Sequence, residues 1–155
     1  MTPPQAGLAC ALAVALLAGC ANSGRKPYAN EAGAKNLSIR TTVSGVRAAL
    51  HVYGVDAQCR PHYLGTLDLG QLSVAVGIPA DRWSYLVFDF ASSSFLGSKR
   101  GRISRDVLLK PRAQYLYEIV ATYRDDIYNV VLHERLPHGA LRELPLLDLA
   151  SCQLS

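Results

Sequence analysis

The sequence predicts an all-β fold, a single antiparallel β-sandwich of about seven or eight strands. From Asn36 onward, polar and apolar residues alternate in stretches rich in Val, Ile, Leu and Tyr, and this period of two is typical of half-buried strands. Clusters of Gly, Pro, Asp and Ser separate these stretches about every ten residues, as turns do in a sandwich. No long helical pattern occurs before Pro137. Because 155 residues suffice for one hydrophobic core, we expect one folded domain.

Eight strands are expected in this domain. The clearest is Tyr115–Arg124, where alternate residues from Tyr115 to Tyr123 place tyrosine, isoleucine and alanine side chains on one face. Only a short link leads from it into Tyr128–Arg135, so these two strands form an antiparallel hairpin. The other expected strands are Leu37–Val43, Ala48–Val55, Tyr63–Asp68, Leu72–Val76, Ser84–Phe90 and Arg102–Leu109. The leucine-rich tail from Pro137 to Ser155 is broken by Pro145, which favours a final edge strand or a short packed turn.

The first 19 residues have the pattern of an export signal. The apolar run from Leu8 to Leu17 spans about ten residues, too few to cross a bilayer as a permanent helix. It is followed by Leu17-Ala18-Gly19-Cys20, which resembles the lipobox of bacterial lipoproteins. The resemblance implies cleavage before Cys20, a thioether-linked diacylglycerol on its sulfur, and an acyl chain on its new amino group. The alternative is an uncleaved hydrophobic N-terminus with an accidental cysteine.

The residue after the lipobox cysteine bears on where such a protein is sorted. In the lipoproteins that the motif resembles, Asp at this position favours retention in the inner membrane, whereas this chain has Ala21. The resemblance therefore implies the outer membrane, with the protein facing the periplasm. The stretch up to Lys35 is small, polar and charged without apolar periodicity, as in a flexible tether. The expected organisation is a signal peptide at 1–19, a lipidated tether at 20–35 and a β-sandwich domain at 36–155.

Two cysteines remain in the predicted mature chain besides Cys20. Export implies an oxidising compartment, so Cys59 and Cys152 are expected to form a disulfide. Two free buried thiols are one alternative, and a zinc site that adds His62 and His138 is another.

Basic residues cluster in the sequence between Lys99 and Arg112. This stretch contains six of them and a single acidic residue, Asp106. The candidate anion-binding residues are Lys99, Arg100, Arg102 and Arg105. Lipid head groups, acidic glycans or an acidic protein face would suit such a cluster, whereas nucleic acid is not expected as a partner of an exported protein. The alternative is a solvated loop and an edge strand protected by its charges.

Leu109, Pro111 and Tyr115 have the spacing of a tyrosine corner. In this respect the chain resembles fibronectin-type and immunoglobulin-like sandwiches, in which the tyrosine hydroxyl bonds back to nearby backbone. Lipobox, tether and sandwich together resemble small outer-membrane lipoproteins with transthyretin-like or immunoglobulin-like domains. The small anchoring lipoprotein of the type VI secretion system is one such family.

The sequence contains no motif that indicates catalysis. It has no Gly-x-Ser-x-Gly turn, no glycine-rich phosphate loop, and no histidine near a nucleophile in a recognisable pattern. We therefore expect no enzyme, no cofactor and no metal. The expected function is that of a membrane-anchored structural or interaction module of an envelope assembly, with a secretion system among the candidates and an envelope protein as partner. The alternative is a lipoprotein that binds an anionic glycan, lipid or small molecule.

Overall fold

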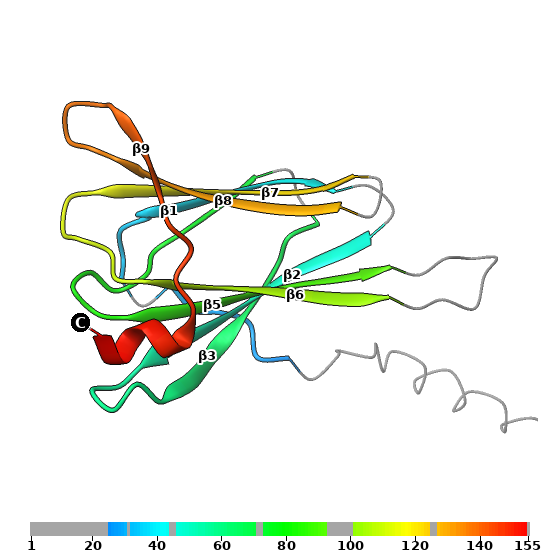
Figure 1. Ribbon diagram of the computed structural model, residues 1–155, viewed down its shortest axis with the longest axis horizontal. Helices are drawn as coiled ribbons and strands as arrows, with labels where there is room; N and C mark the ends of the chain where they lie inside the picture. The colour runs from blue at the N-terminus through cyan, green and yellow to red at the C-terminus, as the bar shows by residue number, and fades with distance from the viewer. Residues whose placement is uncertain are drawn as a thin grey trace, which may run out of the picture.

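The computed structural model describes residues 25–30, 32–43, 46–70, 73–92, 101–124 and 127–154. In this part of the chain the strands form two sheets that pack face to face (Figure 1). The strands are β1 (Leu37–Val43), β2 (Val46–Val55), β3 (Pro61–Asp68), β4 (Ser73–Val76), β5 (Ser84–Ser92), β6 (Arg102–Leu109), β7 (Leu116–Arg124), β8 (Ile127–Arg135) and β9 (Leu141–Leu144), followed by a 3-10 helix, η1 (Leu149–Leu154). The predicted all-β sandwich is confirmed, and the eight predicted strands all form, with bounds that differ by at most two residues.

One sheet has the strand order β4-β1-β7-β8-β9, and the other has the order β3-β2-β5-β6. We call them the five-stranded and the four-stranded sheet. The pairs are antiparallel except β1 with β7, which run parallel over the whole of β1. The predicted antiparallel sandwich is thus confirmed, with this one pair as the exception. A short hairpin forces antiparallel pairing only between consecutive strands, whereas the whole four-stranded sheet lies between β1 and β7 in the chain.

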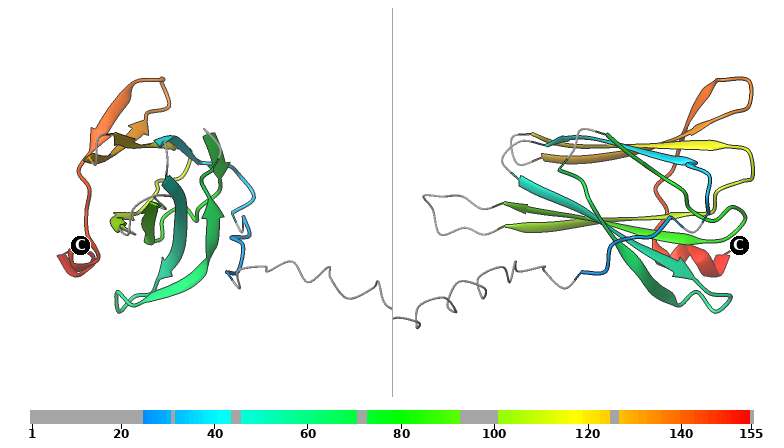
Figure 2. Two further views of the ribbon diagram at one scale, coloured as in Figure 1. Left: turned by 90° about the vertical axis from the view of Figure 1, so that its right-hand side faces the viewer. Right: turned by 180° about the vertical axis from the view of Figure 1, so that it is seen from behind.

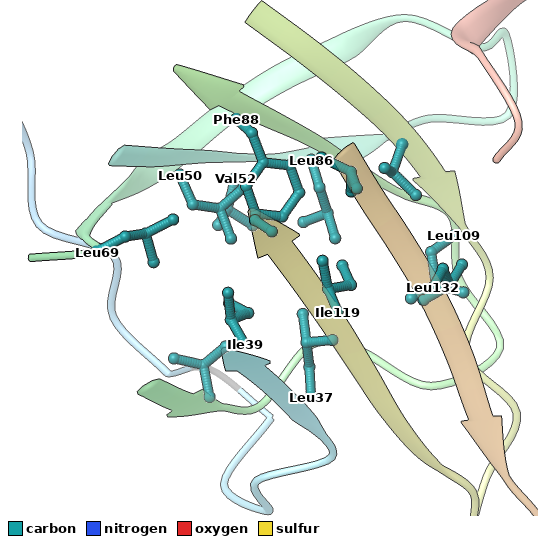
Figure 3. Packing of buried hydrophobic residues seen from close by; sticks show 14 of the residues in the cluster. Leu37, Ile39, Leu50, Val52, Leu69, Leu86, Phe88, Leu109, Ile119 and Leu132 are labelled. Carbon is teal, nitrogen blue, oxygen red and sulfur yellow. The ribbon is translucent and has the colours of Figure 1, made fainter. Parts of the chain in front are cut away.

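The core lies between the two sheets and consists of the alternate residues that each strand turns inward (Figure 3). Leu50 and Val52 of β2 and Phe88 of β5 face Ile39 of β1 and Ile119 of β7, and all five are buried. The intervening residues of each strand lie on the outer faces of the sheets. The alternation of apolar and polar residues in the sequence therefore produces one apolar core between the sheets and two outer faces that differ in composition.

The N-terminal part of the domain begins earlier than predicted. The Tyr28 amide donates to the carbonyl of Thr66 in β3, and the Thr66 amide donates to the carbonyl of Lys26. The Tyr28 ring is buried, and its hydroxyl donates to the carbonyl of Gly77 at 2.8 Å. Residues 26–30 therefore pack beside β3 (blue in Figure 2), and the predicted tether up to residue 35 is wrong for them.

A glycine makes this close approach of two backbones feasible. A Cβ at Gly65 would lie 2.5 Å from the Cα of Tyr28, a distance that real side chains do not tolerate. Composition alone indicated a tether because these residues are small and polar. Backbone hydrogen bonds and one buried aromatic ring hold these residues against β3, and such contacts leave no apolar pattern in the sequence.

The C-terminal tail crosses from one sheet to the other. It forms β9 on the five-stranded sheet, and the amide of Leu108 in β6 then donates to the carbonyl of Leu147 at 2.7 Å. Cys152 in η1 forms a disulfide with Cys59 in the turn between β2 and β3, as predicted. A small second core of Val55, Leu108 and Cys152 surrounds the bond, with Trp83 against it. Both expected forms of the tail are present, an edge strand and then a packed turn.

Candidate functional site

The predicted cation cluster is not a single patch. Arg102 lies opposite Ala91 of β5, whereas Arg105 lies opposite the core residue Phe88. Because the two arginines are three positions apart in one strand, their side chains leave opposite faces of the sheet. Lys99 and Arg100 lie outside the described residues, so the structure leaves that half of the prediction untested. The grouping of Arg102 with Arg105 is wrong, since the cluster was counted along the chain without regard to strand parity.

Arg102 is held by an acidic partner on the outer face of the four-stranded sheet. Its Nε and Nη2 donate to the two carboxylate oxygens of Asp89 in β5, at 2.7 and 2.6 Å. Asp89 is buried although it lies on the outer face. The hydrogen bonds from Arg102 lower the pKa of the Asp89 carboxyl and outweigh the opposing effect of its burial. Arg102 therefore serves first to neutralise a buried carboxylate.

Hydrogen bonds and a close polar contact connect Asp89 to the N-terminal segment. His51 in β2 places its Nε2 3.6 Å from the Asp89 carboxylate, and its Nδ1 is hydrogen-bonded to Thr66 Oγ1 at 2.7 Å. The Thr66 hydroxyl is bonded in turn to the hydroxyl of Tyr63 at 2.6 Å, and Tyr63 donates to the Lys26 carbonyl at 3.3 Å. These polar groups come from β2, β3 and β5, three neighbouring strands.

The order Thr66, His51, Asp89 superficially matches a nucleophile, a base and an acid. The distance from His51 to Asp89 exceeds that of an orienting hydrogen bond. The amide of Thr66, one source of a donor for an oxyanion, already donates to Lys26. The geometry is better suited to binding polar groups on a surface than to acyl transfer.

Three tyrosines lie side by side on the same outer face. The ring of Tyr53 in β2 is 5.4 Å from that of Tyr63 in β3 and 5.8 Å from that of Tyr85 in β5, measured between ring centroids. Tyr63 is 41% exposed. Burial, with the hydrogen bond to Asp106, raises the pKa of Tyr85 to about 12, so this tyrosine is neutral at any physiological pH.

Two pockets open on this outer face, and Arg25 lines both. One has a volume of about 520 Å³ and reaches from Arg25 past His51 to Arg102. The other has a volume of about 610 Å³ and is lined by Arg25 and Arg47, among others. We call the surface formed by Arg25, Arg47, His51, Tyr53, Tyr63 and Arg102 the cationic face.

Most residues of the cationic face were not predicted from the sequence. Arg25 was assigned to a tether, and Arg47 lies just before the predicted start of its strand. His51 and Tyr53 are two positions apart in β2 and alternate with core residues, so strand parity was a usable signal for them. Their neighbours from other strands depend on register between strands, which one strand's sequence does not specify.

The outer face of the five-stranded sheet is different in character. Leu116 of β7, Arg135 of β8 and Leu141 of β9 are direct neighbours across three strands. Leu116 is 50% exposed and Leu141 is 52% exposed. We call Leu116 and Leu141 the leucine row. It lies next to the outer edge of β9, which pairs with no further strand in the described part of the chain.

The tyrosine corner is formed by Tyr117 rather than by the predicted Tyr115. The Tyr117 hydroxyl accepts a hydrogen bond from the amide of Arg112 at 2.9 Å and donates one to the buried carboxylate of Glu134 at 2.9 Å. Tyr115 lies half-buried under the guanidinium of Arg112, 4.1 Å from ring centroid to Cζ. Leu109 and Pro111 are both buried beside this turn. The Leu-Pro-Tyr spacing predicted the position of the turn correctly. It predicted the wrong tyrosine, because the hydroxyl that bonds to the backbone of the turn belongs to Tyr117.

Glu134 joins this turn to the last strand. Arg112 and Arg142 both donate to its carboxylate, each with a contact of 2.6 Å. Burial raises the pKa of Glu134, but hydrogen bonds from Arg112, Tyr117 and Arg142 together hold it below its usual value. These contacts fix the turn between β6 and β7 to β8 and β9, which is a structural role.

The described residues contain no helix of the length and apolar character needed to cross a bilayer. In the same residues, no three His, Cys, Asp or Glu side chains are grouped as metal ligands.

No protein-family model matches the chain, and no curated protein matches it. Among solved structures, the chain is similar to transthyretin from Sparus aurata, with 12% sequence identity and a TM-score of 0.45. That similarity covers 65% of this chain and 98% of the transthyretin chain.

Proposed function

We propose that the protein is a lipid-anchored, non-catalytic interaction module of the bacterial envelope. In this proposal Cys20 carries the lipid and holds the sandwich at the periplasmic face of the outer membrane, where the sandwich recruits an envelope protein. The lipobox at Leu17-Ala18-Gly19-Cys20 supports the anchor. The disulfide between Cys59 and Cys152 agrees with an exported protein, because such bonds persist in oxidising compartments.

The observation that carries the interaction role is the leucine row. Two aliphatic side chains, each half exposed, lie across three adjacent strands beside an open sheet edge. The two leucines flank the exposed Arg135, so a partner that covers them would meet apolar side chains on both sides of a guanidinium, a group that is enriched at protein interfaces. The free backbone groups of an edge strand can accept an added strand. A partner that covers Leu116 and Leu141 and pairs with β9 would satisfy both features.

The alternative function, capture of an anionic ligand through Arg100, Arg102 and Arg105, has less support. Arg102 already pairs with Asp89, and Arg105 leaves the other face of the sheet. An anion that binds the described part of the protein would therefore contact the cationic face. That surface shares only Arg102 with the anion-binding cluster predicted from the sequence.

In-cell crosslinking tests the proposed function. The tagged full-length protein is crosslinked, recovered and analysed by mass spectrometry as wild type, as Cys20→Ala, and as Leu116→Ser with Leu141→Ser. Ile127→Ser is the matched control, because Ile127 is 69% exposed at the far end of β8 in the same sheet.

We expect one envelope protein to be recovered with wild type and with Ile127→Ser. We expect a large loss of that protein with the double leucine variant and with Cys20→Ala, at equal abundance and export of all variants. Recovery of the same protein in equal amounts with the double leucine variant would overturn the role of the leucine row. Recovery of no envelope protein with wild type would overturn the interaction role.

A further inference from the structure

The cationic face receives its positive side chains from three separate elements. Arg25 comes from the N-terminal segment, Arg47 from β2 and Arg102 from β6, and all three are exposed. Lys26, also exposed, neighbours Arg25. Asp89 offsets Arg102, and Asp68 lines the same pocket as Arg25 and Arg47. Arg25, Lys26 and Arg47 against Asp68 leave a formal excess of two positive charges, which lies near the N-terminal segment.

Covalent geometry places this charge close to the proposed anchor. Arg25 is five residues after Cys20, and an extended chain covers at most about 3.6 Å per residue. The lipid-bearing residue therefore lies within about 18 Å of the Arg25 Cα, however the intervening residues are arranged. Since residues 26–30 are bonded to β3, this limit applies to the edge of the four-stranded sheet and not to a freely moving domain.

The exposed aromatic side chains have the character of residues at a membrane interface. Tyr63 is exposed and Tyr53 half-buried, and both line the pocket next to Arg25. Tyrosine rings combine an apolar body with a polar tip, and they are enriched at the level of lipid head groups. Arginine guanidinium groups bind phosphate oxygens in a bidentate manner.

We propose that the cationic face lies against the phosphate-bearing head groups of anionic phospholipids in the membrane that holds Cys20. Each arginine near an anionic surface gains a modest free energy. That gain suffices here because the tether makes the contact intramolecular and so raises its effective concentration. The inference rests on the lipid anchor of the proposed function.

This orientation leaves the proposed partner surface free. The leucine row lies on the outer face of the five-stranded sheet, and the core separates it from the cationic face. The sheets of a sandwich are about 10 Å apart, so a domain with its cationic face on the bilayer presents Leu116 and Leu141 to the periplasm.

The test measures which side of the lipidated protein faces the bilayer. The full-length protein is produced in bacteria, purified with its lipid, and reconstituted into vesicles of equal amounts of phosphatidylcholine and phosphatidylglycerol. A fluorophore is attached to a new cysteine, either Ser104→Cys beside the cationic face or Asn129→Cys on the other sheet. Cys59 and Cys152 are unreactive because they form a disulfide, and Cys20 is blocked by its lipid. Quenching by a nitroxide on the lipid head group reports proximity to the bilayer.

We expect the label at position 104 to be quenched about twofold more than the label at position 129, given that the sheets are about 10 Å apart. Arg25→Gln with Arg47→Gln is expected to reduce the population of molecules whose cationic face lies on the bilayer, relative to all other orientations, by about 30-fold. This factor is equivalent to about 2 kcal/mol, the gain expected for two cations near an anionic surface. Lys35→Gln with Arg135→Gln removes the same charge from a pocket on the other sheet and is expected to change nothing. Vesicles of phosphatidylcholine alone are expected to abolish the difference.

Equal quenching at the two positions in lipidated wild type, or equal effects of the two double variants, would overturn the contact with phospholipid. The anchor of the proposed function would stand in that case. A purified protein without lipid on Cys20 would overturn both the anchor and this inference, and the mass of the protein distinguishes that outcome from the first.

Discussion

Asp89 and Glu134 are buried carboxylates at different depths in the sandwich. Asp89 lies on an outer face, where one guanidinium covers it, whereas Glu134 is enclosed by Arg112, Arg142 and Tyr117. Hydrogen bonds to a charged carboxylate stabilise the charged form, and for both residues they outweigh the effect of burial. Each carboxylate therefore links its strand to residues distant in the sequence.

The lowered pKa values predict how stability depends on pH. A carboxyl whose folded pKa is below its unfolded value contributes stability above the unfolded pKa, about 4, and loses it as pH falls through the folded pKa. We expect Arg102→Gln to destabilise the protein at pH 7, because Asp89 then stays buried without its guanidinium. The difference from wild type should shrink to nothing as Asp89 becomes protonated in both proteins. Urea unfolding from neutral to strongly acidic pH measures this, and a difference independent of pH would contradict the assignment.

The two tyrosines at the β6–β7 turn give a matched pair of variants. Tyr117→Phe removes a hydroxyl that makes one buried and one partly buried hydrogen bond, and we expect it to lower the free energy of unfolding by about 1–3 kcal/mol. Tyr115→Phe keeps the ring under Arg112 and should change stability by less than about 0.5 kcal/mol. Urea unfolding compares the two. Equal losses would contradict the placement of the tyrosine corner at Tyr117.

At the scale of elements, the disulfide determines how the tail is attached. It closes a loop of 93 residues between the β2–β3 turn and η1. The chain-entropy model assigns such a loop about 4–5 kcal/mol. We expect Cys59→Ser with Cys152→Ser to lose up to about that amount, with faster hydrogen exchange at Leu108, whose amide bonds to Leu147. Unchanged exchange at Leu108 would show that the tail stays in place without the bond.

The strands were predictable because their signal is local. β1 and β6 have the bounds that were predicted for them. In β1 buried residues alternate with more exposed ones, as its sequence indicates, whereas in β6 burial is confined to Val107, Leu108 and Leu109. The pairing of β1 with β7 was not predictable in the same way. It joins strands that are far apart in the chain, and no turn specifies its direction.

The cationic face was unpredictable for a related reason. His51, Tyr63 and Arg102 come from three strands, and they meet only through the registers of β2 with β3 and β5 and of β5 with β6. The docking of Tyr28 beside β3 has no apolar pattern in the sequence, because backbone hydrogen bonds and a single ring provide it. The disulfide was predictable since only two cysteines remained to pair once Cys20 was assigned.

At the scale of the whole molecule, the two outer faces of the sandwich differ in chemistry. The four-stranded sheet carries arginines and tyrosines next to the point where the chain enters the domain, and the five-stranded sheet carries the leucine row at its edge. In the proposed arrangement, this difference lets the protein present one side to a bilayer and the other to a partner. Both the proposed partner contact and the proposed contact with phospholipid depend on the anchor at Cys20.

Intact-mass and peptide mass spectrometry of the protein from bacterial membranes test this anchor most directly. We predict a mature chain that begins at Cys20 and carries a diacylglycerol and an additional acyl chain, recovered in the outer-membrane fraction. Cys20→Ala is predicted to lack the lipid and to leave that fraction. A chain that retains residues 1–19, or one that begins elsewhere without lipid, would contradict the account.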